Sequence, residues 1–187
     1  MRRQRMVWTV LGVLLWVPEV CATTLARMSL GELAAASSAV ARVRCLDNES
    51  RWDGGEIWTF STFEVLETLK GTAPRLITVR LPGGRVGHLL SRVDGVPRFH
   101  PDEEAILFLE RTPAGDFSVT SWVQGTFRIR REPHTGKARV TQDSAAFPVF
   151  DPATRRFQET GIRNLPLDVF KQRLAATVER HWQGRQP

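Results

Sequence analysis

Short β-type segments, separated by glycine and proline turns at a spacing of about ten residues, constrain the fold of this chain more than any other feature. Residues 39–45 (AVARVRC) alternate apolar and polar side chains, which is typical of a strand with one buried face. Residues 105–109 (AILFL) are continuously apolar, which is typical of a strand buried on both faces. The pattern predicts a mainly β fold, either a small antiparallel barrel or a sandwich.

Further strands continue this pattern along the chain. They are expected at residues 56–69, at residues 76–81, at residues 117–124, and in a hairpin that joins residues 127–131 to residues 137–141. The β-branched and aromatic residues of 56–69 extend far enough for a bent strand that serves two sides of a closed sheet. Asp47-Asn48-Glu49-Ser50 and Asp53-Gly54-Gly55 are turn-forming residues, and we expect them together to end the first strand.

Two helices are expected, one near each end of the chain. Ser29 and Glu32 have the spacing of a capping box, which predicts a short helix over about 30–37. Residues 166–182 return to a helical period, and Pro166 suits a helix start. The apolar face of this amphipathic helix consists of Leu167, Phe170, Leu174 and Val178. We expect it to dock on the strands.

The N-terminus has the parts of a secretory signal peptide. A cationic stub (1–5) precedes an apolar run (6–17), and Val20 and Ala22 suit the recognition positions of a cleavage site. The apolar run would make about 18 Å of helix, well short of the ~30 Å hydrocarbon core of a membrane. We therefore expect cleavage after Ala22, a secreted or periplasmic protein, and no integral membrane segment after cleavage.

Removal of residues 1–22 leaves a chain of one domain's length. We expect a single β-rich domain over 23–187, with its core at about 30–150 and a C-terminal hairpin and helix at 151–187. Cleavage also removes Cys21, so Cys45 has no partner for an internal disulfide, which suits a bacterial periplasm or cell surface. Because Cys45 continues an apolar alternation, we expect it to be buried and unreactive.

The basic residues do not indicate a nucleic-acid-binding surface. Loss of the signal peptide lowers the formal charge from +6 to +4, because three arginines and one glutamate leave with it. Arg42 and Arg44 alternate with apolar residues, and so do Arg128 and Arg130. These positions predict solvated strand faces rather than one massed basic patch. We expect no nucleic-acid partner.

Motifs for metal binding and for catalysis are missing from the sequence. The four histidines, His88, His100, His134 and His181, are scattered, and no H-x-x-x-H or C-x-x-C occurs. There is no G-x-S-x-G elbow, and Gly83-Gly84-x-x-Gly87 lacks the Lys-Ser/Thr of a phosphate loop. His100 beside Asp102, Glu103 and Glu104 is interpreted as a polar turn. We expect no catalytic residues, no metal and no cofactor.

Four motifs occur in a fixed order: T-F-x-V-L-x-T-L-K-G at Thr62–Gly71, V-R-L-P-G-G at Val79–Gly84, P-x-F at Pro97–Phe99 before DEEAILFL, and Q-G-x-F at Gln124–Phe127. In this order the chain resembles a group of uncharacterised exported bacterial proteins over about 30–130. More distantly it is similar to the netrin-like, OB-type barrel of the tissue metalloproteinase inhibitors. The resemblance implies an OB-like fold. Such inhibitors chelate the protease zinc through an N-terminal cysteine, whereas this mature chain is expected to begin at Thr23.

The loop over 82–101 is the first candidate for a binding surface. Its glycines, Gly83, Gly84 and Gly87, are expected to prevent regular structure up to about Pro97. Loops of this length tend to be functional, and this one carries four basic or titratable side chains, Arg85, His88, Arg92 and Arg98. Arginine forks suit a carboxylate, so an acidic partner or ligand is expected.

These observations favour a non-enzymatic binding module outside the cytoplasm, for an unknown protein or an acidic ligand. An exported metalloprotease inhibitor is one alternative, and a small hydrolase is another, because distant acidic and histidine side chains can converge in a fold. Tryptophans could stack on sugars, but in a fold of this size they are expected in the core; they are Trp52, Trp58, Trp122 and Trp182.

Overall fold

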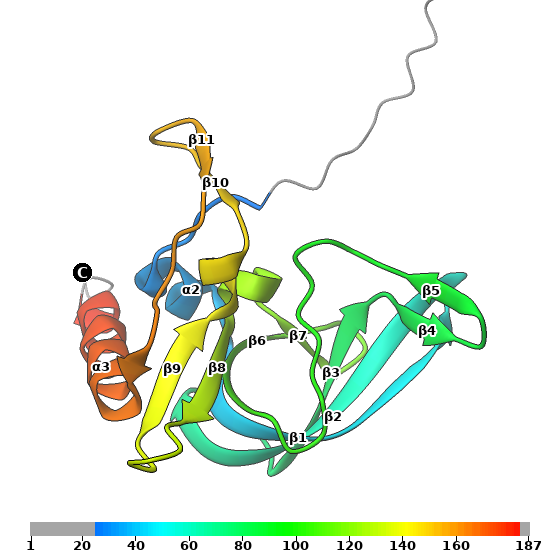
Figure 1. Cartoon of the computed structure of the whole chain (residues 1–187), viewed down its shortest axis with the longest axis horizontal. Helices are drawn as coiled ribbons and strands as arrows, with labels where there is room; N and C mark the ends of the chain where they lie inside the picture. The colour runs from blue at the N-terminus through cyan, green and yellow to red at the C-terminus, as the bar shows by residue number, and fades with distance from the viewer. Residues whose placement is uncertain (1–24, 184–187) are drawn as a thin grey trace, which may run out of the picture.

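The computed structural model describes residues 25–183. The predicted signal peptide, with its cleavage site at Ala22, lies outside the described residues. The protein is mainly β, with 47% strand and two helices in the part described (Figure 1). Neither of these two helices has the length and apolar character needed to cross a membrane.

The elements follow one another in an order close to the prediction. They are α2 (Leu30–Ala36), β1 (Ala39–Asp53), β2 (Glu56–Lys70), β3 (Leu76–Pro82), β4 (Gly84–Val86), β5 (Leu89–Ser91), β6 (Glu104–Arg111), β7 (Phe117–Val119), the 3-10 turn η1 (Trp122–Gln124), β8 (Thr126–Arg131), β9 (Ala138–Gln142), the 3-10 turn η2 (Asp143–Ala146), β10 (Val149–Asp151), β11 (Arg156–Gln158), β12 (Leu165–Pro166) and α3 (Leu167–Gln183). The capping box of Ser29 and Glu32 is present at the start of α2. The predicted hairpin is formed by β8 and β9.

The strand pairings form a closed circuit. β1 pairs with β2 on one side and with β6 on the other, and both pairings are antiparallel. β2 pairs with β3, and β7 pairs with β6. A single parallel pair, Val79 with Phe117, joins β3 to β7. β8, β9 and β12 extend the sheet beyond β6, and β4 and β5 form a small separate hairpin (Figure 1).

Two hydrophobic clusters share the strand β6. Ala105, Leu107 and Leu109 belong to the first cluster, with Phe63 and Val79 from the strand circuit. Ile106 and Phe108 point the other way, into a second cluster that includes both helices. This double burial confirms the prediction made from the continuous apolar run, and it explains why the run lacks alternation.

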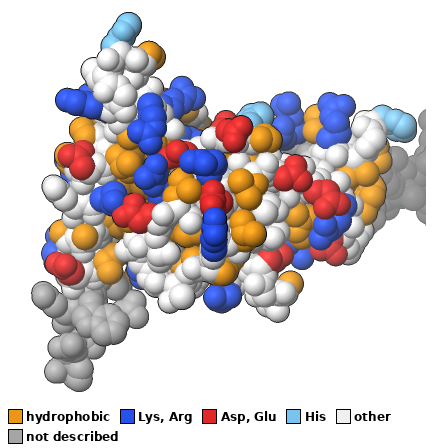
Figure 2. All heavy atoms as spheres, turned by 90° about the horizontal axis from the view of Figure 1, so that it is seen from below, with side chains coloured by type: hydrophobic (Ala, Val, Ile, Leu, Met, Phe, Trp, Pro, Cys, Tyr) orange, Lys and Arg blue, Asp and Glu red, His pale blue; other side chains and the backbone are white. Residues whose placement is uncertain are grey.

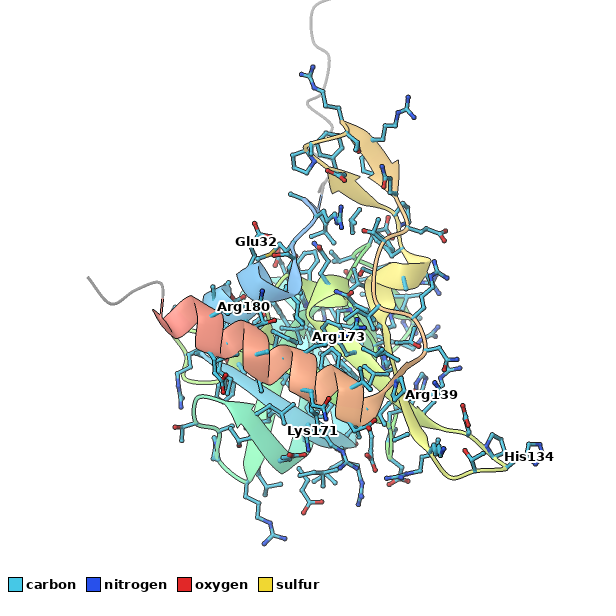
Figure 3. All side chains as sticks on the ribbon, turned by 90° about the vertical axis from the view of Figure 1, so that its left-hand side faces the viewer. Glu32, His134, Arg139, Lys171, Arg173 and Arg180 are labelled. Carbon is cyan, nitrogen blue, oxygen red and sulfur yellow. The ribbon has the colours of Figure 1, made fainter. Side chains whose placement is uncertain are left out.

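The C-terminal helix covers the second cluster, as predicted. Phe170 is fully buried, and its ring lies 4.9 Å from that of Phe127. Leu174 is 1% exposed, while Leu167 and Val178 are partly buried against the same cluster. Figure 3 shows α3 lying across the outside of the molecule, where the labelled Arg173 and Arg180 belong to its exposed residues. An ion pair of 2.5 Å between Lys171 Nζ and Glu67 Oε1 joins the helix to β2.

Three local predictions were wrong. β1 does not end at Asp47–Ser50, because each of these turn-forming residues is paired with β2; it continues to Asp53 and ends at the predicted turn of Gly54 and Gly55. The loop expected to be irregular up to Pro97 contains the β4–β5 hairpin. The strand expected over 117–124 stops at Val119, and η1 follows it after a two-residue turn. In the first case long-range pairing outweighs local turn preference.

The arginines predicted on solvated strand faces are in part buried. The side chains of Arg42 and Arg128 are 21% and 20% exposed, and both hold carboxylates at 2.6 Å, those of Glu104 and Glu103. Burial acts to raise the pKa of Glu104, but the hydrogen bond and charge of Arg42 outweigh it and hold this pKa below its usual value. Figure 2 shows positive and negative side chains interspersed over the underside of the molecule, with no massed basic patch on that face.

The tryptophans do not all lie in the core either. Trp52 is 53% exposed. Trp58 is half-buried on the outer side of β2, where the guanidinium of Arg80 lies 3.9 Å from the centre of its ring. The side chain of Trp182 lies outside the described part. The predicted core position is therefore wrong for Trp52, which lies beside the turn that closes the β1–β2 hairpin.

Gln124 and Gly125 of the Q-G-x-F motif have structural roles. The buried Gln124 side chain accepts a hydrogen bond of 2.7 Å from the Met28 N–H and donates one of 2.7 Å to the Ala26 carbonyl, so it holds the N-terminal segment. At Gly125 a Cβ atom would lie 2.1 Å from the Thr120 carbonyl oxygen. Close backbone approach therefore requires glycine here.

Candidate functional site

A pocket of about 290 Å³ lies between the segment 83–100 and the half of the β1–β2 hairpin that is nearer its turn. Its floor consists of neutral polar side chains, namely Asn48 and Ser50 from β1 and Thr59 and Ser61 from β2. Apolar groups form the walls, among them Leu81, Pro82 and Phe99. Its volume lies at the small end of the range of about 300–1,000 Å³ that is usual for ligand sites.

Strand register brings the floor residues together. Asn48 pairs with Ser61, and Ser50 pairs with Thr59. Cross-strand partners share one face of a sheet, so all four side chains lie on the face that carries Cys45 and Phe63 further along the hairpin. The inner face of the hairpin therefore changes from apolar to polar as it leaves the core.

Hydrogen bonds join this floor to the segment above it. Thr59 Oγ1 donates to the carbonyl of Gly83 at 2.7 Å, and Asn48 Nδ2 donates to the carbonyl of Phe99 at 3.1 Å. Within the floor, Ser61 donates to Asn48 Oδ1 at 2.6 Å, and the hydroxyls of Ser50 and Thr59 lie 2.9 Å apart. The two ends of the segment are therefore held on the same pair of strands.

The glycines of the V-R-L-P-G-G motif permit this close approach. Gly83 and Gly84 have φ angles of +88° and +140°, which favour glycine. A Cβ atom on Gly84 would lie 2.4 Å from both Ser50 Oγ and Thr59 Oγ1. Any side chain at Gly84 would therefore push the segment off the floor.

Three arginines lie at the rim of the pocket. Arg85, Arg92 and Arg98 are all exposed lining residues, and none of the residues that line the pocket is acidic. Within the described residues none of these guanidinium groups pairs with a carboxylate, whereas many other arginines do. The rim therefore offers positive charge that the protein itself does not neutralise.

The fourth rim residue is His100, which lies in a polar turn as predicted. Its Nδ1 lies 3.1 Å from Glu103 Oε1, and its backbone N–H donates to Glu103 Oε2 at 3.1 Å. Arg128 also donates to Glu103 Oε2, at 2.6 Å; it donates to the Arg98 carbonyl at 2.7 Å and lies over the Phe99 ring at 4.5 Å. These contacts hold residues 98–103 against β8.

The structure brings together three of the four residues predicted for the loop. Arg85, Arg92 and Arg98 line the pocket, but His88 lies in the exposed turn between β4 and β5 and is not among the lining residues. The floor residues were not predicted as part of a site, whereas His100 was considered as a hydrolase residue and interpreted as part of a polar turn. The signal of the floor residues was a change from apolar to neutral polar residues at inward positions of both strands, but an unpaired residue, Leu46, shifts the alternation of β1 by one.

Cys45 lies at the inner end of the floor and is fully buried. Burial raises the pKa of its thiol, and a hydrogen bond from Asn48 acts in the opposite direction but does not cancel the effect. We expect a maleimide reagent to modify Cys45 only in denaturant. Mass spectrometry after native and denatured labelling measures this, and complete labelling of the native protein within minutes would contradict burial in solution.

The described residues contain no group of three or more His, Cys, Asp or Glu side chains that could hold a metal ion. The pocket is thus a site of guanidinium groups, one imidazole and neutral polar groups. The chain matches no protein-family model and none of the curated proteins.

Proposed function

We propose that this protein is a non-enzymatic binding module that holds a small, negatively charged ligand in the pocket above Asn48 and Ser50. The observation that carries the proposal is that three arginines without a carboxylate partner, Arg85, Arg92 and Arg98, line one pocket that has no acidic lining residue. Guanidinium forks match carboxylate and phosphate oxygens in pairs, which gives both affinity and orientation.

The proposal includes an OB-like fold and export. The circuit of pairings β1-β2-β3-β7-β6-β1, with its parallel β3–β7 contact, supports the fold. The sequence of residues 1–22 supports export, and a mature protein that begins at Thr23 in intact-mass analysis is the expected outcome. We also propose that the partner is not a nucleic acid. The interspersed positive and negative side chains on the face in Figure 2 support this part of the proposal.

Titration calorimetry with inorganic phosphate, succinate and glucuronate tests the binding proposal. We expect at least one of these anions to bind with a dissociation constant below about 1 mM, and binding to weaken as salt is added, because exposed charges are screened. Replacement of Arg85 and Arg92 by glutamate should weaken binding at least tenfold, since hydrogen bonds to charged groups contribute about 1.5–3 kcal/mol each.

A matched double variant serves as control. Arg155 and Arg156 are exposed residues of the β10–β11 hairpin, outside the pocket, and their replacement by glutamate changes the net charge by the same amount. This control should bind the anion as the unmodified protein does. Equal loss in both double variants, or no binding of any anion at 10 mM, would refute the proposal; about 10 mM corresponds to a very weak complex.

A hydrolase is the second candidate, because His100, which lines this pocket, is hydrogen-bonded to Glu103 outside the lining. Catalysis by such a pair needs a nucleophile within hydrogen-bond reach of the imidazole. Among the described residues the imidazole of His100 is hydrogen-bonded to Glu103 and to no serine or threonine. Turnover of a p-nitrophenyl ester that is lost in His100→Ala would favour the hydrolase over the binding module.

A further inference from the structure

The hydroxyl groups of the pocket floor donate their protons to hydrogen-bond acceptors within the protein. Thr59 has one hydroxyl proton, and it goes to the Gly83 carbonyl at 2.7 Å. A carbonyl oxygen accepts only, so in the 2.9 Å contact between Ser50 and Thr59 the donor is Ser50. Ser50 Oγ therefore keeps its acceptor positions and has no proton left for a ligand.

The partners of the Asn48 side-chain amide also determine which of its atoms donates and which accepts. The Phe99 carbonyl oxygen can contact only the donor side of the amide, so Nδ2 faces Phe99 and Oδ1 faces Ser61. The proton of Ser61 then goes to Oδ1, and Ser61 itself is fully buried beneath the pocket. The second proton of Asn48 Nδ2 is directed to Cys45 Sγ at 3.5 Å. The half-buried groups of the floor, Asn48, Ser50 and Thr59, thus have no proton left for a ligand and offer oxygen acceptors.

From this arrangement we infer that the ligand is a polyhydroxylated anion, such as an acidic sugar. The inference rests on the proposed anion-binding function and adds the class of ligand. The hydroxyl groups of such a ligand donate hydrogen bonds to the acceptors of the floor, while its carboxylate or phosphate accepts hydrogen bonds from the rim arginines. An ammonium group would also donate, but the pocket lining has no carboxylate to balance its charge.

A second hollow beside the pocket supports a sugar. It measures about 300 Å³ and shares Pro82, Gly83 and Val93 with the first pocket. Glu56 also lines it, so this hollow suits the neutral hydroxyl side of a sugar and not its anionic group. Trp52 forms part of its lining and is 53% exposed. An exposed indole face packs well on the C–H face of a pyranose ring, while the hydroxyls at the ring edge remain free for hydrogen bonds.

Titration calorimetry with matched ligands tests this inference. Glucuronate carries a carboxylate and ring hydroxyls, cyclohexanecarboxylate has the carboxylate on a ring without hydroxyls, and glucose has the hydroxyls without the charge. We expect glucuronate to bind about tenfold or more tighter than either, because each group supplies separate hydrogen bonds. Glucose 6-phosphate, compared with glucuronate, distinguishes a phosphate source of the charge from a carboxylate.

The Ser50→Ala variant removes an accepting oxygen from the floor. We expect it to reduce the preference for glucuronate over cyclohexanecarboxylate by about fivefold or more. Ser118→Ala, on β7 and outside the pocket, should keep the full preference. Equal affinity for glucuronate and cyclohexanecarboxylate would overturn the hydroxyl inference and leave anion binding intact. If no anion binds at all, the proposed function fails together with the inference.

Discussion

The Phe170→Ala variant is expected to lower the free energy of unfolding by about 3–5 kcal/mol. Phe170 is fully buried between α3 and the sheet, where its ring contacts that of Phe127. Loss of the ring removes apolar burial and leaves a cavity that a helix held also by Leu174 cannot fill by moving. The melting temperature should fall by about 6–12 °C.

Phe157→Ala is the matched control for Phe170→Ala. Phe157 is 61% exposed on the β10–β11 hairpin, so the same chemical change there should cost less than about 1 kcal/mol. Thermal and urea unfolding, followed by circular dichroism, measure both variants. An unchanged melting temperature in Phe170→Ala would mean that α3 is not docked on the sheet in solution.

Phe63→Ala is expected to have an effect of similar size, about 3–5 kcal/mol, in the first hydrophobic cluster. Phe63 is fully buried and makes an edge-to-face contact of 5.0 Å with Phe99. Since the Phe99 carbonyl holds Asn48, the cavity should also loosen the pocket wall. We therefore expect weaker binding of glucuronate at a temperature where the variant is still folded.

Phe63→Leu tests the cause of that effect. It keeps most of the apolar volume, so it should cost less than about 2 kcal/mol. Urea unfolding gives the stability of both variants, and calorimetry at 10 °C gives their binding. A large stability loss in Phe63→Ala with unchanged binding would mean that Phe99 keeps its position without the support of Phe63.

Much of the fold could be predicted from the sequence because local pattern and burial agree. The apolar run of β6, the capping box of α2 and the period of α3 each correspond to what the structure contains. The error at Asp47–Ser50 has a physical reason. These residues prefer turns, but the hydrogen bonds and side-chain pairs of a long hairpin outweigh that preference.

The site could be predicted only in part. A glycine-bearing loop with unpaired arginines has a local signal, and Arg85, Arg92 and Arg98 do line one pocket. The floor has a weaker signal, because the bulge at Leu46 reverses which residues of β1 face inward. The number of domains and the export of the chain stay predictions.

The double burial of β6 has a consequence for hydrogen exchange. Its amides pair with β1 on one side and with β7 and β8 on the other, and its side chains join both clusters. No local opening exposes Leu107 or Phe108 to water without separating both halves of the core. The slowest amides of the protein should therefore be those of β6, and the opening free energy they report should equal that of complete unfolding.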